Sequence, residues 1–283
     1  MLDEALSAEV LTRARKGGAD FAELYAERWR RRQLRILDGE VKEATSGLEY
    51  GAGLRLFYGP EVVYGYTNEL TPDGLRELVE TLTRLKGRAG RVDREGRGGL
   101  DFRKASARGL HAPRVRFETQ PKRYRLDRLR EADAGARIAP EIRKVECGLL
   151  EWHQEVLVAN SEGTWTEDQR IRTRLRVVAI AEGNGEVQQG VAVPGLSVGL
   201  ELLERYPPRD MGKQAAEQAL TNLRARPAPA GTMPVVIGNA FGGVIFHEAL
   251  GHLLETTSVA RKVSVLTDKL GEANRELRSD VHR

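Results

Sequence analysis

Two histidines and a glutamate stand close together in the stretch FGGVIFHEALGHLLE, residues 241 to 255. His247 is followed directly by Glu248, and His252 completes the pattern H-E-x-x-x-H. Neutral imidazoles are zinc ligands, and a carboxylate beside the first ligand can take a proton from water as a general base. Because Zn²⁺ lowers the pKa of its water to about 7, these three side chains suit the hydrolysis of a peptide bond.

The five-residue spacing of the two histidines constrains the backbone between them. At about 100° per residue, such positions differ by about 140° and do not face one ion in a straight α-helix. Either a π-type turn brings the two side chains together, or the helix ends near Gly251 and His252 follows in a looser turn. Glycine suits both distortions, because it accepts backbone angles that other residues avoid.

The alternative to a metal site is a buried helix whose histidines make ordinary hydrogen bonds. Most other positions of the stretch are apolar, which predicts such burial: Val244, Ile245, Phe246, Leu250, Leu253 and Leu254. Two imidazoles in a buried helix each need a polar partner, and a metal ion supplies one. We therefore favour the metal site. Glu255 is the nearest further carboxylate, and we interpret it as a surface residue of the last turn rather than a group that supports the ligands.

The elements that position this motif are predicted from periodicity and from turn residues. Hairpin turns are expected at Asp38-Gly39 and Asn184-Gly185, because both residue pairs tolerate positive φ. The stretch TMPVVIGN, which precedes the motif, is expected to be a short buried strand. Helices are expected at 4–16, 72–86, 124–137 and 208–225, and strand-rich stretches at 22–70 and 142–193.

This order of elements predicts an α+β fold, with antiparallel sheets and packed helices. Residues 1–95 form the expected N-terminal α+β unit. Residues 96–121, which hold few large apolar side chains, are expected to be an exposed connection. Residues 122–283 form a second α+β unit that carries the motif helix.

Composition limits the classes of function. The chain has 283 residues with a net charge of +4, and its basic side chains are 36 arginines and nine lysines spread along the chain. A spread surplus is weak support for nucleic-acid binding, which usually needs a concentrated patch. We therefore expect no nucleic-acid partner and interpret the run ERWRRRQLR, residues 27–35, as a solvated strand or helix face.

Cellular location is predicted from what the sequence contains. The single cysteine, Cys147, allows no internal disulfide and fits a reducing compartment. No apolar run approaches the roughly 20 residues that span a bilayer, and the N-terminal residues lack the apolar stretch of a signal peptide. We therefore expect a cytoplasmic protein with no membrane partner.

The motif and its surroundings resemble the TldD/PmbA family, specifically its TldD-type zinc metallopeptidase. The stretch GGVIFHEALGHLLETTSVA is similar to the family signature, and LRILDGEVKEATSGLEYGAGLRLFYG to its N-terminal domain. The resemblance continues through QEVLVANSEGTWTEDQR and SVLTDKLGE. It implies a TldD/PmbA-like α+β fold in the N-terminal region, with His247 and His252 as zinc ligands and Glu248 as the catalytic base.

The resemblance also implies substrates and partners. Family members are zinc peptidases that act on unfolded proteins or peptides, with a TldE/PmbA-type partner subunit that lacks the motif. We expect such a partner, or a homo-oligomer, for this chain. The family draws a third zinc ligand, a cysteine, from a strand-rich C-terminal domain that extends beyond the length of this chain.

Cys147 lies before the motif and does not match the family's ligand cysteine, so we interpret it as a small buried side chain. His282 stands in a polar tail and is not expected to be a ligand. The chain is therefore expected to be a TldD-like zinc metallopeptidase shortened at its C-terminus. The alternative is a catalytically silent domain that binds a partner or is vestigial.

Overall fold

The structure is a computed structural model that describes residues 1–86, 100–106, 112–238, 242–269 and 271. The chain divides into two compact units, Met1–Arg226 and Pro227–Arg283. The first holds the whole sheet and its helices, and we call it the sheet unit. The second holds the H-E-x-x-x-H motif, and we call it the motif unit. In the described residues, no helix is long and apolar enough to cross a membrane.

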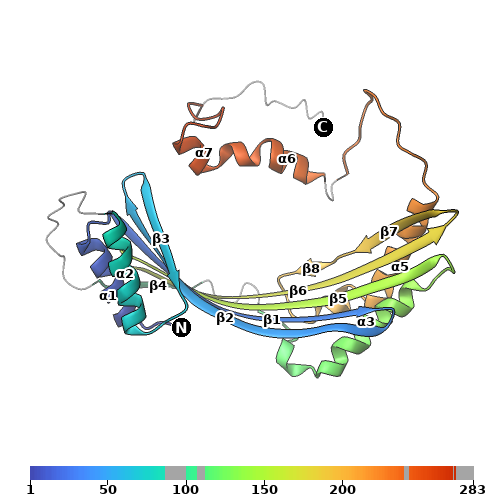
Figure 1. Ribbon diagram of the computed structural model, residues 1–283, viewed down its shortest axis with the longest axis horizontal. Coiled ribbons are helices and arrows are strands. Elements are labelled where there is room, and N and C mark those ends of the chain that lie inside the picture. The colour runs from blue at the N-terminus through green and yellow to red at the C-terminus, as the bar shows by residue number, and fades with distance from the viewer. Residues whose placement is uncertain (87–99, 107–111, 239–241, 270, 272–283) are drawn as a thin grey trace. The chain divides into compact units, whose positions relative to one another are not determined.

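Eight strands of the described residues form one sheet in the sheet unit (Figure 1). Their order is β3-β2-β1-β5-β6-β4, with β7 and β8 also paired to β6. All pairs are antiparallel except β4 with β6, so the predicted α+β class with an antiparallel sheet is confirmed. The strands are β1 Phe21–Leu37, β2 Glu40–Tyr58, β3 Glu61–Thr67, β4 Arg103–Ser106, β5 Ile142–Asn160, β6 Thr164–Gly183, β7 Glu186–Ala192 and β8 Gly195–Leu196.

The two predicted hairpin turns are confirmed. Asp38 and Gly39 have φ angles of 51° and 78°, and Asn184 and Gly185 have 54° and 78°. Two successive positive φ angles are the signature of a type I′ turn, whose twist matches that of the flanking strands. These short turns allow β1 to pair with β2, and β6 with β7, immediately from the turn.

The predicted helices are confirmed within one or two residues at their ends. Thr71 caps the second predicted helix, because its hydroxyl accepts from the Gly74 amide at 3.1 Å. The helices of the sheet unit are α1 Glu4–Lys16, α2 Pro72–Lys86, η1 Phe117–Thr119, α3 Lys122–Ala136, α4 Leu202–Arg205 and α5 Pro208–Leu223.

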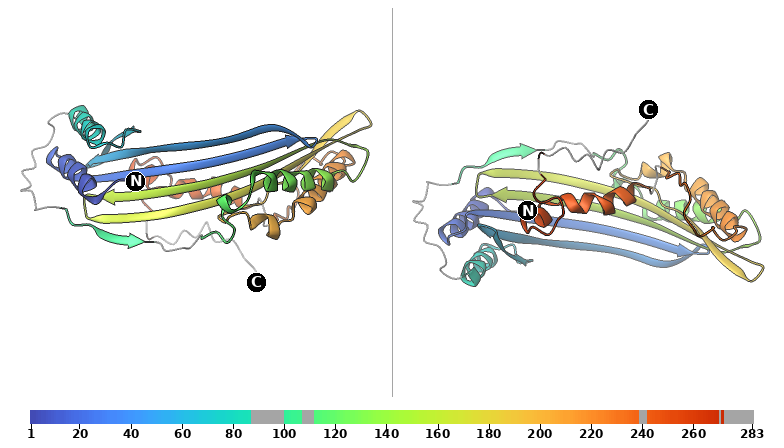
Figure 2. Two further views of the ribbon diagram at one scale, coloured as in Figure 1. Left: turned by 90° about the horizontal axis from the view of Figure 1, so that it is seen from below. Right: turned by 90° about the horizontal axis from the view of Figure 1, so that it is seen from above.

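These helices all pack against the same face of the sheet, which we call the covered face. Even-numbered residues of β1 point to it, because side chains alternate along a strand. Leu24 belongs to a core cluster with residues of α1 and α2, and Ile36 to a second cluster with residues of α3 and α5. Figure 2 shows α3 and α5 against one side of the strands. Cys147 is fully buried in the second cluster, as the sequence predicts, and burial raises the pKa of its thiol.

A buried ion pair joins α3 to the sheet. The Arg125 guanidinium donates to both carboxylate oxygens of Glu151 on β5, at 2.5 and 3.0 Å. It also donates to the backbone oxygens of Phe117 and Gln120, at 2.6 and 2.9 Å. Only 8% of Arg125 and 1% of Glu151 are exposed, so these bonds replace the water that both charges lose.

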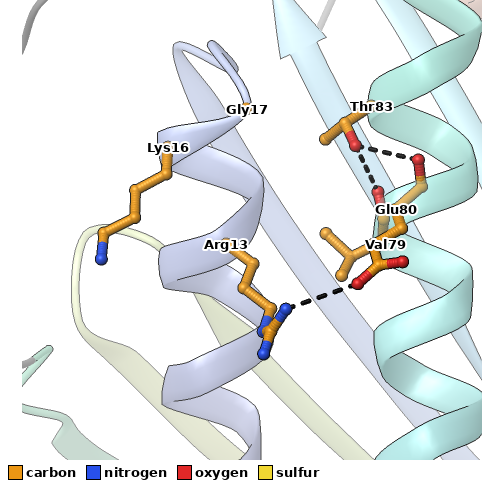
Figure 3. A pocket seen from close by; sticks show the side chains of 6 residues that line it. All are labelled: Arg13, Lys16, Gly17, Val79, Glu80 and Thr83. Atoms are coloured by element: carbon orange, nitrogen blue, oxygen red, sulfur yellow. Dashed lines mark hydrogen bonds and ion pairs between the residues drawn. The ribbon is translucent and has the colours of Figure 1, made fainter.

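The helices α1 and α2 lie close together and enclose a shallow cavity of about 290 Å³ (Figure 3). A Cβ atom at Gly17 would approach the Thr83 Cγ2 atom to 2.4 Å, so a larger residue there would force the Thr83 side chain to shift. The two helices are also joined by Glu9, which accepts from Arg76 at 2.8 and 3.0 Å. The hydrogen bond from Arg76, with help from Arg13, lowers the pKa of Glu9 to about 2.

The expected connection at 96–121 lies partly outside the described residues. In its described part, β4 pairs with β6 and Phe117 is buried, so this stretch is not exposed along its whole length. Strands from both sides of the connection share one sheet, because β1 pairs directly with β5. The predicted division into domains at this connection remains a prediction.

Candidate metal centre

The motif unit resolves the question of the five-residue spacing. The first helix, α6, covers Gly243–Ala249 and ends with Leu250, whose backbone leaves the helical range at φ −128° and ψ −46°. A 3-10 helix, η2, then covers Gly251–Leu254, and α7 covers Thr256–Ala260. The structure therefore has the helix end of the second predicted distortion, near Gly251, but His252 follows in a 3-10 helix, which is tighter than the looser turn expected.

The expected role of Gly251 is different from the one the structure shows. Its backbone is not left-handed, and a Cβ atom there would lie 3.6 Å from the His247 Nδ1 atom, an ordinary contact. The change in direction is made at Leu250 instead. A small side chain at position 251 keeps space beside the His247 ring, and no special backbone angle is needed.

The change of helix type brings the motif side chains together. His247, Glu248 and His252 each offer a ligand atom, and these atoms all lie within 4.8 Å of one another. The two imidazole rings are 4.7 Å apart at their centroids, with planes inclined by 69°. The His252 Nε2 atom lies 3.6 Å from the Glu248 Oε2 atom. Residues five apart in the sequence therefore share one side of the chain.

Glu255 contributes more than the sequence analysis expects. Its Oε1 atom lies 2.5 Å from the His252 Nδ1 atom, and this hydrogen bond raises the pKa of His252. A carboxylate on one ring nitrogen fixes the ring orientation and leaves the other nitrogen, here Nε2, to bind a metal. The signal was available in the sequence, because residues three apart lie close together in a single helical turn.

The apolar side chains of the motif helix, whose pattern alone favours burial, are exposed in the structure. No residue of α6 is buried, and 64% of Phe246 is exposed. Apolar residues predict burial only where another element packs on them, and the described motif unit contains only short helices and turns. The predicted strand TMPVVIGN is wrong in its described part, residues 232–238, which has no strand partner and is exposed.

A second turn supports η2. The Ser264 hydroxyl donates to the Leu253 backbone oxygen at 2.6 Å and accepts from the Leu266 amide at 3.1 Å. Ser264 is the one buried residue among those described in this unit. His282, which we do not expect to be a ligand, lies outside the described residues.

The donor set fits a zinc ion. Two imidazoles and a carboxylate are ligand types that Zn²⁺ takes, and all three side chains are open to solvent and to a substrate. No cysteine joins the group within the described residues, since Cys147 is buried in the core of the sheet unit. The Glu248 carboxylate could accept a proton from water held near the metal, because it lies 3.6 Å from the His252 Nε2 atom that is left for the metal.

Comparison with known proteins gives three family matches in order along the chain. Residues 22–86 match the PmbA/TldA metallopeptidase domain 1, residues 116–223 the central domain, and residues 230–275 the C-terminal domain. The last match contains the whole H-E-x-x-x-H motif. The first two matches both lie in the sheet unit and leave residues 87–115 between them.

Two curated relatives are named as metalloproteases. The chain is 30% identical to the metalloprotease TldD homolog of Haemophilus influenzae over 89% of this chain and 53% of the relative. It is 26% identical to a metalloprotease of Methanothermobacter thermautotrophicus over 89% of this chain and 54% of that one. The chain thus spans about half the length of these curated relatives.

Solved structures confirm the fold. A protein from Thermotoga maritima, described as a candidate modulator of a DNA gyrase, superposes with a TM-score of 0.70 at 20% identity, over 94% of this chain and 59% of that one. TldE from Thermococcus kodakarensis gives a TM-score of 0.62 at 14% identity, over 94% and 59%. At these identities the likeness shows the fold alone.

Proposed function

Because the chain belongs to the PmbA/TldD metallopeptidase family, we propose that it carries the metal-binding part of a zinc peptidase, with His247 and His252 as ligands and Glu248 as the general base. The observation that supports this most is the convergence of these side chains within 4.8 Å, despite a spacing that a straight helix would not tolerate.

The three side chains would have separate roles. His252 would bind through Nε2, because Glu255 engages its Nδ1 atom. A bound Zn²⁺ would polarise the substrate carbonyl and lower the pKa of water. Glu248, whose Oε2 atom lies 3.6 Å from His252 Nε2, would accept the proton from water and pass it to the leaving amine. Glu255 would orient His252 without touching the substrate.

We propose unfolded polypeptides or peptides as substrates. All three motif side chains are exposed, so an extended chain can reach them without a preformed tunnel among the described residues. We expect the partner to be a chain of the same fold, such as a TldE-type subunit, or a second copy of this chain. Exposed apolar side chains on α6 and η2, such as Phe246 and Leu254, give the motif unit a surface that such a partner could cover.

The alternative function is a domain that binds a partner without cleaving it. It is favoured by the donor count, because catalytic zinc usually has three protein ligands and only two imidazoles converge here among the described residues. In that case the chain would retain zinc weakly or not at all.

Metal content and cleavage of an unfolded peptide test the proposal. We expect about one zinc per chain after dialysis, and peptide cleavage that the Glu248→Gln variant loses by at least a hundredfold while its zinc content stays unchanged. Asp268→Asn is the matched control, because Asp268 is an exposed acid of the same unit without an ion pair in the described residues. Absence of both zinc and cleavage, or equal cleavage by the two variants, would contradict the proposal.

A further inference from the structure

The face of the sheet opposite the covered face carries no helix among the described residues of the sheet unit, and we call it the open face. Odd-numbered residues of β1 and even-numbered residues of β5 and β6 point to it. Its centre is a grid in which Arg31 stands opposite Trp152, and Trp152 opposite Arg172. The rows beside it hold Trp29, Gln154 and Arg170 on one side, and Gln33, Leu150 and Arg174 on the other.

Arginines of this grid lie over its tryptophans. The Arg31 guanidinium is 5.0 Å from the Trp29 ring centroid, and the Arg174 guanidinium is 5.9 Å from the Trp152 centroid. A guanidinium held over an aromatic ring keeps its N–H groups at the rim, where they can donate to a planar anion in pairs. The tryptophans therefore orient the arginines in advance.

Among the described residues, three of these cations have no acidic side chain within ion-pair distance, although Arg31 interacts at longer range with Glu27 on the same face. Within the described residues, Arg31, Arg172 and Arg174 form no ion pair, and all three are exposed. Their neighbours on the same face are neutralised: Arg170 contacts Asp168 at 2.9 Å, and Arg176 contacts Glu146 at 2.7 Å. Positive charge is thus concentrated at the centre of the open face and balanced towards its ends.

Beside this centre lies a hollow of about 170 Å³, where Gly148 faces outward between Arg35 and Arg176. Arg174, Gln33 and Glu146 also line it, and Glu146 pairs with both Arg35 and Arg176. A Cβ atom at Gly148 would meet only the Leu34 backbone oxygen, at 3.9 Å. The missing side chain therefore leaves space that a ligand side chain can enter next to guanidinium groups.

We propose that the open face binds an extended, acidic segment of polypeptide, with its carboxylates on Arg31, Arg172 and Arg174. Alternate residues of an extended chain lie roughly 6.8 Å apart, which is also the spacing of Arg172 and Arg174 along β6. Two carboxylates in alternate positions can therefore meet Arg172 and Arg174, Arg31 offers a third cation two strands away, and a further side chain can enter the hollow at Gly148. The identification of this segment as part of a substrate rests on the proposed function, whereas its binding does not.

The same face is less suited to a nucleic acid. Single strands bind through bases that stack on free aromatic rings along a continuous basic groove. Here arginines lie over both central tryptophans, and acidic side chains such as Asp168 and Glu146 interrupt the positive charge. Three free cations match a short run of carboxylates better than a long phosphate backbone.

Fluorescence anisotropy with the full chain tests this proposal. The probe is a labelled peptide with glutamate at every second position, compared with the same peptide carrying glutamine and with a labelled oligothymidylate. We expect the acidic peptide to bind at least tenfold more tightly than both other probes. The double variant Arg172→Gln with Arg174→Gln should lose at least tenfold in affinity, and Arg31→Gln about threefold.

Two further variants separate a specific site from general charge. Arg30→Gln removes an equally exposed arginine that points to the covered face, so it should change the affinity less than twofold. Gly148→Val fills the hollow in space that the backbone leaves open, and should weaken binding several-fold without lowering the melting temperature.

Equal effects of Arg30→Gln and Arg31→Gln would overturn the proposal, as would tighter binding of the oligonucleotide or equal binding of the glutamine peptide. The outcome is independent of the proposed function, because the same titration on Glu248→Gln should give unchanged affinity. If the unaltered chain binds the acidic peptide but cleaves no peptide, only the peptidase is contradicted. If it cleaves peptides but does not bind the acidic peptide, only this site is contradicted.

Discussion

The sheet unit and the motif unit are held together in different ways. In the sheet unit, β1 pairs with β5 across more than a hundred residues of sequence, and Leu24 and Leu54 are fully buried. Among the described residues of the motif unit, the side-chain hydrogen bond with the largest sequence separation joins Ser264 to Leu253, eleven residues apart. The fold of the first depends on distant parts of the chain, whereas the arrangement of the second depends on a few consecutive turns.

Because of this difference, the stability of the sheet unit and the chemistry of the motif side chains can change separately. The covered face and its helices can lose stability without any change at His247 and His252, since the contacts that position these histidines are local. The motif can likewise be altered without disturbing the core. Substitutions in the two units should therefore affect different measurements.

The largest effect is expected at the buried ion pair of the sheet unit. Arg125→Leu leaves the buried Glu151 carboxylate with only Arg32, at 3.6 Å, and removes the donor from three backbone oxygens. The free energy of unfolding should therefore fall by about 3–5 kcal/mol. Chemical denaturation measures this. Zinc content should not change beyond what partial unfolding explains, and a drop below 1 kcal/mol would contradict the buried pair. The double variant Arg125→Leu with Glu151→Leu should recover part of the loss.

A second test compares one apolar side chain from each unit. Leu54→Ala opens a cavity in the core and should cost about 2–5 kcal/mol, whereas Phe246→Ala should change the unfolding free energy of the sheet unit by less than about 0.5 kcal/mol. Leu48→Ala is the control within the same strand, because 56% of Leu48 is exposed. Similar losses for Leu54→Ala and Phe246→Ala would show that the two units are not independent.

The smallest effect is expected for the pH dependence of the free energy of unfolding, at an ion pair on the surface of the sheet unit. Glu9 has a pKa of about 2 when it accepts from Arg76, below the ordinary value of 4.5. Its contribution to stability is therefore present above pH 4.5 and is lost as the pH falls towards 2. Glu9→Gln should flatten this part of the stability profile. Glu77→Gln, an exposed acid of α2 with no ion pair in the described residues, should leave the profile unchanged; identical profiles for both would refute the assignment.

The elements that the sequence predicts best are those whose geometry is decided locally. Asp38-Gly39 and Asn184-Gly185 form the predicted turns because their backbones accept positive φ in any context. The ends of α1 and α2 follow from a cap and from the periodicity of apolar residues. The convergence of the motif is also local, which is why one of its two predicted distortions matches the structure in where the helix ends.

What the sequence could not provide depends on contacts between distant residues. The apolar residues of α6 predict burial, but burial needs another element to cover them. The parallel pairing of the short β4 with β6 has no local signal. The open face could not be predicted from the sequence either. Its grid of side chains comes from three strands, and only the strand order of the folded sheet shows that they are neighbours. The contact of Glu255 with His252 is the exception, since its three-residue spacing was in view.

The late arrival of β5 has a consequence for synthesis on the ribosome. About 100 residues separate the end of β1 from the start of β5. At ordinary translation rates, the β1 edge of the new β1–β2 hairpin therefore stays unpaired for roughly 5 to 20 s before β5 is synthesised. An unpaired strand edge invites pairing with another chain, and charged side chains discourage it. The arginine-rich stretch at residues 28–32 lies along this unpaired edge. Its repulsion would keep nascent hairpins of neighbouring ribosomes apart until β5 is made.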